Sequence, residues 1–251
     1  MYPEEASPAR WLELYAATFD VVEVNATFYR LPTRAAVERW AGATPDRFVF
    51  AVKASRYLTH VRRLRELGAG VARLRERIVP LEEAGKLGPI LWQLPARFHR
   101  DDERLASALE ELGPGRHAFE FRHPSWFSRD VEALLNEHGV ACVVADSSRR
   151  GLPVPRRTAD WTYVRFHDGR GRNGNYSERQ LAEWAAGLRR GPPGYAFFNN
   201  DWEGFAVANA LRLCELLRPG ARSSAPRRRQ VLPIGATAGD GARGRRGSLV
   251  R

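Results

Sequence analysis

Cysteine and lysine are both scarce in this chain of 251 residues. The two cysteines, Cys142 and Cys214, lie far apart, and neither has a second ligand residue at the spacing of a metal site. We therefore expect two buried free thiols and no structural zinc. The only lysines are Lys53 and Lys86, so arginine supplies nearly all of the 40 basic residues. A GC-rich coding sequence explains this arginine bias as well as selection for phosphate binding does.

Membrane, export and two catalytic signals are also missing from the sequence. No run of about 18 apolar residues is long enough to cross a membrane, and residues 1–5 lack the basic and apolar parts of a signal peptide. The chain has neither a Gly-rich phosphate-binding loop nor the Gly-x-Ser-x-Gly turn of a serine hydrolase. We therefore expect a cytoplasmic protein that contacts no membrane and uses neither of these two designs.

Positive charge is concentrated in the C-terminal segment. The formal net charge is +11; residues 218–251 hold nine Arg and one acidic residue, whereas residues 1–217 hold 31 basic and 28 acidic residues. Residues 218–251 are also rich in Gly, Ser, Ala and Pro, a composition typical of disorder. We expect a folded domain over residues 1–217 and a disordered tail over residues 218–251. The tail is either a non-structural extension, which we favour, or a basic arm that binds nucleic acid.

Seven short apolar runs alternate with stretches of helical periodicity. The runs occupy residues 21–29, 48–55, 88–95, 117–123, 140–147, 161–168 and 194–201. Apolar residues recur at helical spacing in residues 33–41, 62–84, 102–112, 129–138, 177–189 and 203–217. This alternation predicts a mostly parallel sheet built from strand, helix and strand units. The chain length fits one barrel domain of about 250 residues.

Polar residues stand near the C-terminal end of every run. They are Glu23 and Asn25, Lys53, Gln93, Glu120 and Arg122, Asp146, Arg165 and His167, and Asn199 and Asp201. Residues two apart in a strand point to the same face, so each pair projects to one side. A closed α/β barrel places its active-site residues at the C-terminal ends of its strands, whereas an open doubly wound sheet usually carries a Gly-rich loop after its first strand. The pattern therefore predicts a TIM-barrel-like (β/α)₈ fold with one polar mouth.

Five segments of the chain closely resemble the YecE-like family, also called domain of unknown function seventy-two. The segments are Val22 to Tyr29, Leu87 to Pro95, Phe119 to Trp126, Tyr163 to His167, and Phe198 to Asp201 with Gly204 and Asn209-Ala210 after it. They follow the family's order over residues 1–217. The resemblance implies a TIM-barrel-like fold. It implies no reaction, because the activity of the family is itself unassigned.

Two positions depart from the pattern of this family. Its members begin with a strand that carries a Gly-Thr-Ser-Gly-Trp-like motif, whereas here Met1 directly precedes Tyr2-Pro3-Glu4. We expect the first strand to be absent, so that seven of the eight strands are recognisable, and we hypothesise that the start codon has been assigned too late. Asp168 stands where the family often has Gly after the Arg-x-His segment, which affects the local turn more than the site.

The polar strand ends suggest acid and base chemistry on a small anionic or polyhydroxylated substrate. Paired carboxylates in different environments can divide acid and base roles, so Glu23 and Glu120 are the first candidates for proton transfer. Lys53 can act as a point charge or, if desolvated, as a nucleophile, and His167 can move a proton. The predicted substrate-binding residues are Asn25, Gln93, Arg122, Asp146, Arg165, Asn199, Asn200, Asp201 and Trp126. We expect a hydrolase, lyase or isomerase that needs neither a metal nor another cofactor.

Three other interpretations of the same residues stay open. The ring of alternating charges is also what a hydrogen-bond network that fixes strand register would contain. A nucleic-acid-binding module would stack bases on aromatic residues and meet phosphates with Arg. A non-catalytic barrel would bind a ligand without turnover. The oligomeric state does not follow from the sequence.

Overall fold

The computed structural model describes residues 7, 10–148 and 151–218 as a mixed α/β fold. All strand pairings in this part of the chain are parallel. The strands are β1 (Val21–Val24), β2 (Val49–Lys53), β3 (Leu87–Gln93), β4 (His117–Glu120), β5 (Ala141–Cys142), β6 (Val144–Ser147), β7 (Thr162–Asp168) and β8 (Gly194–Phe198). The predicted tail falls, from residue 219 onward, outside the described residues.

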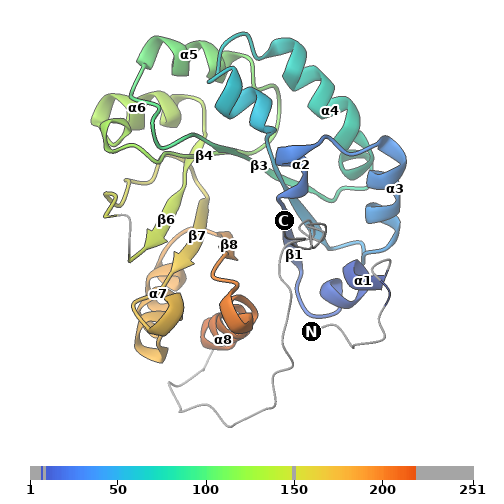
Figure 1. The fold of residues 1–251 in the computed structure, drawn as a ribbon, viewed down its shortest axis with the longest axis vertical. Coiled ribbons are helices and arrows are strands. Elements are labelled where there is room, and N and C mark those ends of the chain that lie inside the picture. Colours follow the sequence, from blue (N-terminus) through green and yellow to red (C-terminus); the bar gives the residue numbers. More distant parts are fainter. Residues whose placement is uncertain (1–6, 8–9, 149–150, 219–251) are drawn as a thin grey trace, which may run out of the picture.

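The strands form two sheets that follow one another along the chain. One sheet has the order β1-β2-β3-β4-β5 and the other has the order β6-β7-β8. The predicted run over residues 140–147 supplies both β5 and β6, because its first half pairs with β4 and its second half pairs with β7. Within the described ranges, β1 and β8 each pair with one strand only. Figure 1 shows the strands on the inner side of an open, curved arrangement with the helices around its outer side.

The six predicted helical stretches each contain a helix. The helices are α1 (Trp11–Ala16), α2 (Ala26–Tyr29), α3 (Arg34–Gly42), α4 (Gly68–Glu83), α5 (Asp102–Glu110), α6 (Arg129–Glu137), α7 (Glu178–Arg190) and α8 (Phe205–Leu217). Side-chain caps start several of them; Ser177, for example, forms a capping box with Gln180 at the start of α7. Short turns of other helix types occupy η2 (Tyr57–Val61), η3 (Pro124–Trp126), η4 (Arg172–Gly174) and η5 (Trp202–Gly204). No helix among the described residues is long and apolar enough to span a bilayer.

The strand within the run over residues 21–29 is shorter than the composition of this run predicts. β1 ends at Val24, and residues 26–29 form the short helix α2. The buried Thr27 hydroxyl lies 2.8 Å from the carbonyl oxygen of Val24 and 2.7 Å from that of Lys53. It therefore ties the ends of β1 and β2 together at the edge where the polar residues emerge.

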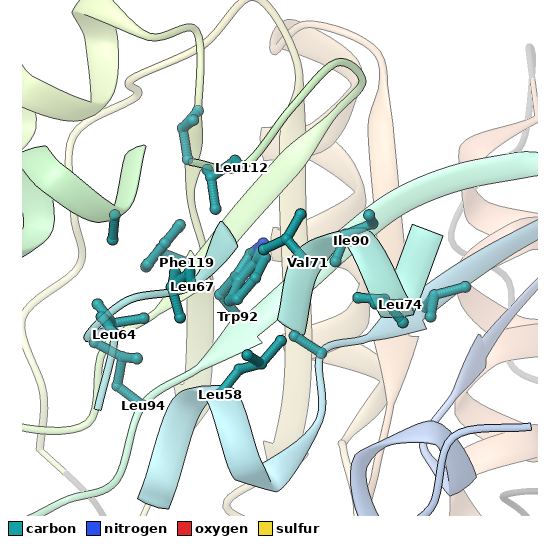
Figure 2. Packing of buried hydrophobic residues seen from close by; sticks show 14 of the residues in the cluster. Leu58, Leu64, Leu67, Val71, Leu74, Ile90, Trp92, Leu94, Leu112 and Phe119 are labelled. Atoms are coloured by element: carbon teal, nitrogen blue, oxygen red, sulfur yellow. The ribbon is translucent and has the colours of Figure 1, made fainter. Parts of the chain in front are cut away.

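Alternation along the strands separates an outer apolar layer from an inner face. In β3, Ile90 and Trp92 point outward into a core formed with the helices, while Leu91 joins a second buried cluster with Ala51, Ala118 and other residues of neighbouring strands. Figure 2 shows Trp92 between β4 and helix α4, where its ring stacks on Phe119 with centroids 5.9 Å apart. The same alternation continues to the C-terminal ends of the strands, where the inward-pointing side chains are polar.

Candidate functional site

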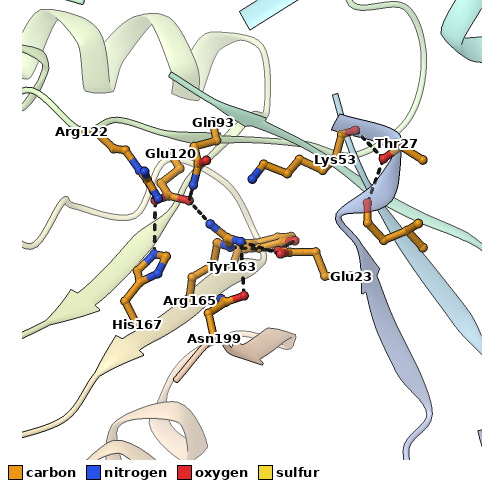
Figure 3. Close-up of polar contacts among 11 residues, drawn as sticks. Glu23, Thr27, Lys53, Gln93, Glu120, Arg122, Tyr163, Arg165, His167 and Asn199 are labelled. Carbon is orange, nitrogen blue, oxygen red and sulfur yellow. Dashed lines mark hydrogen bonds and ion pairs between the residues drawn. The ribbon is translucent and has the colours of Figure 1, made fainter. Parts of the chain in front are cut away.

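Arg165 on β7 lies at the centre of the polar strand ends. Its guanidinium binds Glu23 of β1 through two contacts, Nη2 to Oε1 at 2.6 Å and Nε to Oε2 at 3.0 Å, and its Nη1 donates to Oε2 of Glu120 on β4. Burial alone would lower the pKa of Arg165, but the two carboxylates outweigh it and raise the pKa. Arg165 is therefore a fixed cation that links the two sheets (Figure 3).

Glu120 is completely buried and binds four side chains. Besides Arg165, it accepts from Gln93 Nε2 at 2.9 Å and Arg122 Nε at 3.0 Å, and its Oε1 lies 3.3 Å from His167 Nε2. Burial would raise the pKa of this carboxyl group, but Arg165, followed by His167 and Arg122, holds it well below the ordinary value. Glu120 is therefore a carboxylate at neutral pH, held for charge balance and poorly suited to release a proton.

Tyr163 is a member of the site that the sequence analysis missed. Its hydroxyl donates to Glu23 Oε2 at 2.6 Å, and its ring is buried on the inner face of β7. Burial and the charge of Glu23 raise the pKa of Tyr163 well above its ordinary value, so the phenol stays a donor. The alternation Tyr163, Arg165, His167 along one strand face was the signal that could have found it.

Lys53 differs from the other cations of the site because its ammonium has no hydrogen-bond or ion-pair partner among the described residues. Its side chain is 8% exposed and its Nζ lies 4.5 Å from the centre of the Phe28 ring. Burial, with Arg165 as the next contribution, lowers the pKa of Lys53 from 10.5 to about 8, although Glu23 and Glu120 act in the opposite direction. Figure 3 shows the side chain extending from β2 toward the interior of the site.

The positive charges of Lys53 and Arg122 act on His60, which lies beside the strand-end residues. It lies in η2, a single turn of π-helix, and packs edge-on against the ring of Phe28. Burial lowers its pKa to about 4, and the positive charges of Lys53 and Arg122 are the next two causes. Isolated π-helical turns are frequent at functional sites. His60 is therefore neutral at physiological pH, next to a surplus of cations.

Three amide side chains near the strand ends, those of Asn25, Asn199 and Asn200, have a buried polar atom without a partner in the described structure. Asn199, just after β8, lies 3.5 Å from Arg165 through its Oδ1, while its Nδ2 makes no hydrogen bond. Asn25, just after β1, has an unpaired Oδ1. Buried polar groups usually find partners, so unpaired ones call for an explanation such as a ligand. For brevity, the strand-end cluster denotes Glu23, Lys53, Gln93, Glu120, Arg122, Tyr163, Arg165, His167 and Asn199.

Besides Asn25, four predicted site residues are not part of the strand-end cluster. Asp146 pairs with Phe166 of β7 and shares its outward face, where Asp146 lines a pocket of about 300 Å³ beside Asp168. Asn200 donates to the carbonyl oxygen of Gly174, and Asp201 is exposed. Trp126 is 1% exposed; it stacks on Phe121 and donates to the Phe98 carbonyl oxygen, so it belongs to the hydrophobic core.

The strand-end cluster contains neither of the two cysteines, and the metal-ligating residue types are not grouped within it. Both cysteines of the chain are free; Cys142 is buried, as expected, whereas Cys214 is exposed. In the part of the chain that the structure describes, no three His, Cys, Asp or Glu side chains are grouped so that they could hold a metal ion. Arg165 lies between Glu23 and Glu120 and binds both, and Arg122 also binds Glu120, so these carboxylates are already paired with cations.

The chain matches a family model described as "Protein of unknown function DUF72" over residues 1–231. The chain belongs to the DUF72 family. UPF0759 protein YunF of Bacillus subtilis is 26% identical over 264 residues, which cover 90% of this chain and 93% of YunF. UPF0759 protein YecE of Escherichia coli K12 is 36% identical over 143 residues, or 54% of this chain and 52% of YecE.

Solved DUF72 structures share the fold described above. The crystal structure of a DUF72 protein from Thermotoga maritima is 31% identical, with a TM-score of 0.76 over 86% of this chain and 92% of that one. A DUF72 protein from Enterococcus faecalis V583 is 21% identical, with a TM-score of 0.72 over 84% of this chain and 95% of that one, a likeness of fold alone. Neither description names an activity, so any function of this DUF72 chain must be argued from its own strand-end cluster.

Proposed function

We propose that this protein is an enzyme that acts on a small anionic or polyhydroxylated compound at the strand-end cluster. The observation that carries the proposal is the charge balance. Three cations, Lys53, Arg122 and Arg165, surround two carboxylates, Glu23 and Glu120. Among the described residues, one positive charge of this largely buried site is left without a counter-ion, and an anionic group of a substrate would supply the missing charge.

The two carboxylates take a different role from the one that the sequence suggested. Glu23 and Glu120 are both bound to Arg165, and the lowered pKa of Glu120 makes it a weak base. In this proposal they orient Arg165 and keep it charged. Lys53 and His167 become the candidates for chemistry, while Gln93 and Tyr163 hold the carboxylates in place. Asn199, with its unpaired amide nitrogen, becomes a substrate-binding donor.

The architecture that best fits this role is a TIM-barrel-like one. The strands are parallel and follow chain order, and the polar side chains gather at their C-terminal ends, which is where barrel enzymes keep their active sites. Hydrolase, lyase and isomerase chemistry all suit a site of this composition. Two free thiols fit a reducing compartment, so we place the protein in the cytoplasm in this proposal.

A ligand-stabilisation experiment tests the proposal. The melting temperature of the full chain is measured with small carboxylates, phosphates and sugar phosphates, and with uncharged sugars of the same size. A ligand at 100 times its Kd stabilises a protein by about 2.7 kcal/mol. We expect at least one small anion to raise the melting temperature, and the matching uncharged compound to raise it less.

Two arginine variants make the experiment specific to the site. Arg122→Gln removes a partly exposed cation of the strand-end cluster and should abolish most of the anion effect. Arg47→Gln removes an exposed cation that pairs with Asp20 outside the cluster, and should leave the effect intact. Equal responses in the two variants would contradict the proposal. A stabilising anion that is never turned over would instead identify a ligand-binding barrel.

A further inference from the structure

The two lysines of this chain are both buried but have opposite surroundings. Lys86 is 5% exposed, and its Nζ donates to the carbonyl oxygens of Ala41 and Thr44 at 2.6 and 2.7 Å, with Thr44 Oγ1 at 3.4 Å. Lys53 is 8% exposed and, among the described residues, has no acceptor for any of its three hydrogens. A buried ammonium is normally paired. Lys86 therefore has a structural role, and a role of this kind does not account for the burial of Lys53.

We propose that Lys53 is a nucleophile that forms an imine with a small aldehyde or keto acid carrying a negative charge. This assignment rests on the proposed function and narrows its substrate class to anionic carbonyl compounds. The apolar side of the site is the ring of Phe28, 4.5 Å from the amine. The polar part of the site includes Arg165, whose charge acts on the amine, with Asn199 next to it and the Asn199 amide nitrogen unpaired. The substrate's negative group would be held by these donors and by Arg122 while its carbonyl carbon meets the amine.

The surroundings of Lys53 keep its amine reactive at neutral pH. The groups that act on it are Arg165, Glu23, Glu120 and Arg122, in addition to its burial. With a pKa of about 8 in place of 10.5, roughly 200 times more of the amine is neutral at pH 7.5 than for an ordinary lysine. Lysines desolvated in an apolar pocket or placed beside another cation are activated as nucleophiles in this way.

The proposed step balances without an added reagent. The amine nitrogen forms a bond to the carbonyl carbon as the carbon–oxygen π bond breaks. Two hydrogens that began on the ammonium move to the oxygen, which leaves as water. The product is the protonated imine, with one hydrogen left on nitrogen and the positive charge of the former ammonium retained. The site therefore keeps its total charge through the step, and Arg165 stays paired with the carboxylates of Glu23 and Glu120.

Reductive trapping tests this assignment on the full chain. The protein is incubated with cyanoborohydride and either glyoxylate, an anionic aldehyde, or glycolaldehyde, an uncharged one, and the modified peptides are mapped by mass spectrometry. The chain offers only three amines, those of Lys53, Lys86 and the N-terminus. We expect glyoxylate to modify Lys53 at least tenfold faster than Lys86, because the amine of Lys86 is buried and bound to three acceptors. Preference for glyoxylate over glycolaldehyde should be greater at Lys53 than at the N-terminal amine.

Variants separate recognition from reactivity. Arg122→Gln should reduce the preference of Lys53 for glyoxylate while Lys53 still reacts with glycolaldehyde. Lys86→Arg should leave trapping at Lys53 unchanged. If Lys53 stays unmodified while the N-terminal amine reacts, or if both amines show the same preference, the assignment is wrong. If anions still stabilise the wild type but not Arg122→Gln, the proposed function stands even though the imine assignment fails. If neither trapping at Lys53 nor stabilisation by anions is observed, both the assignment and the proposed function are refuted.

Discussion

The unpaired amine of Lys53 predicts that this residue destabilises the folded protein at neutral pH. Its side chain is buried, and it has no hydrogen-bond acceptor in the described part of the chain. Replacing it with Met keeps an unbranched side chain of similar length and removes the charge. If the site is built for chemistry at the expense of stability, Lys53→Met should therefore be more stable than the wild type at pH 7. Functional sites commonly carry such a cost.

The magnitude follows from the pKa of Lys53. The folded state lowers it from 10.5 to about 8, and one pKa unit corresponds to about 1.4 kcal/mol, so the charged amine costs the fold about 3 kcal/mol below pH 8. Above pH 8 the folded protein releases this proton while the unfolded chain keeps it until about pH 10.5. The wild type should therefore gain stability from this group as pH rises from 8 to 10.5, and the advantage of Lys53→Met should shrink over the same range.

Urea denaturation of both proteins at pH 7 and pH 9.5 measures the effect. Lys86→Arg serves as the matched control, because Lys86 donates to three acceptors and its replacement should destabilise at both pH values. A Lys53→Met protein that is less stable than the wild type at pH 7 would refute the reasoning. It would show that Lys53 is a structural counter-ion of Glu23 and Glu120.

Three further predictions concern the elements around the site. Glu120→Gln should cost about 3 kcal/mol in urea denaturation, because it breaks a buried ion pair; unchanged stability would contradict its central position. His117, whose burial lowers its pKa to about 4, accepts from the Trp92 indole; the wild type should lose up to about 3 kcal/mol as pH falls from 6.5 to 4, and His117→Leu should lose less over that range. Gly88→Ala places a Cβ 2.5 Å from Val49 Cγ1, so a melting temperature several degrees lower is expected from overpacking of about 1–3 kcal/mol.

Strand alternation made much of the site predictable from the sequence. Arg165 and His167 share a face of β7, and Glu23 and Glu120 lie near the C-terminal ends of strands of the other sheet, so their convergence required only parallel strands in chain order. Their division of roles was not predictable. The low pKa of Glu120 depends on Arg165, which is 45 residues away in the chain, and no local pattern encodes that contact.

Asp146 shows where the alternation of side chains along a strand gives a wrong prediction, because the choice of which residues point inward is wrong for this run. The inward residues of its run are Ala141, Val143 and, opposite Arg165, Ala145, so Asp146 must point outward with Phe166. The small inward side chains carry this information, which a prediction from the polar strand end alone leaves out. Trp126 was misplaced for another reason, because a Trp beyond a strand end can pack on the core or line the mouth, and only tertiary contacts decide.

The central claim is that the strand-end cluster carries an uncompensated positive charge beside the amine of Lys53. The most direct test is an NMR titration of protein labelled with [6-¹³C]lysine, which gives two signals because the chain has two lysines; Lys53→Met assigns them. We predict a Lys53 pKa of about 8, which rises when a small anion that stabilises the protein is added. A Lys53 pKa near 10.5 that no anion changes would contradict the account.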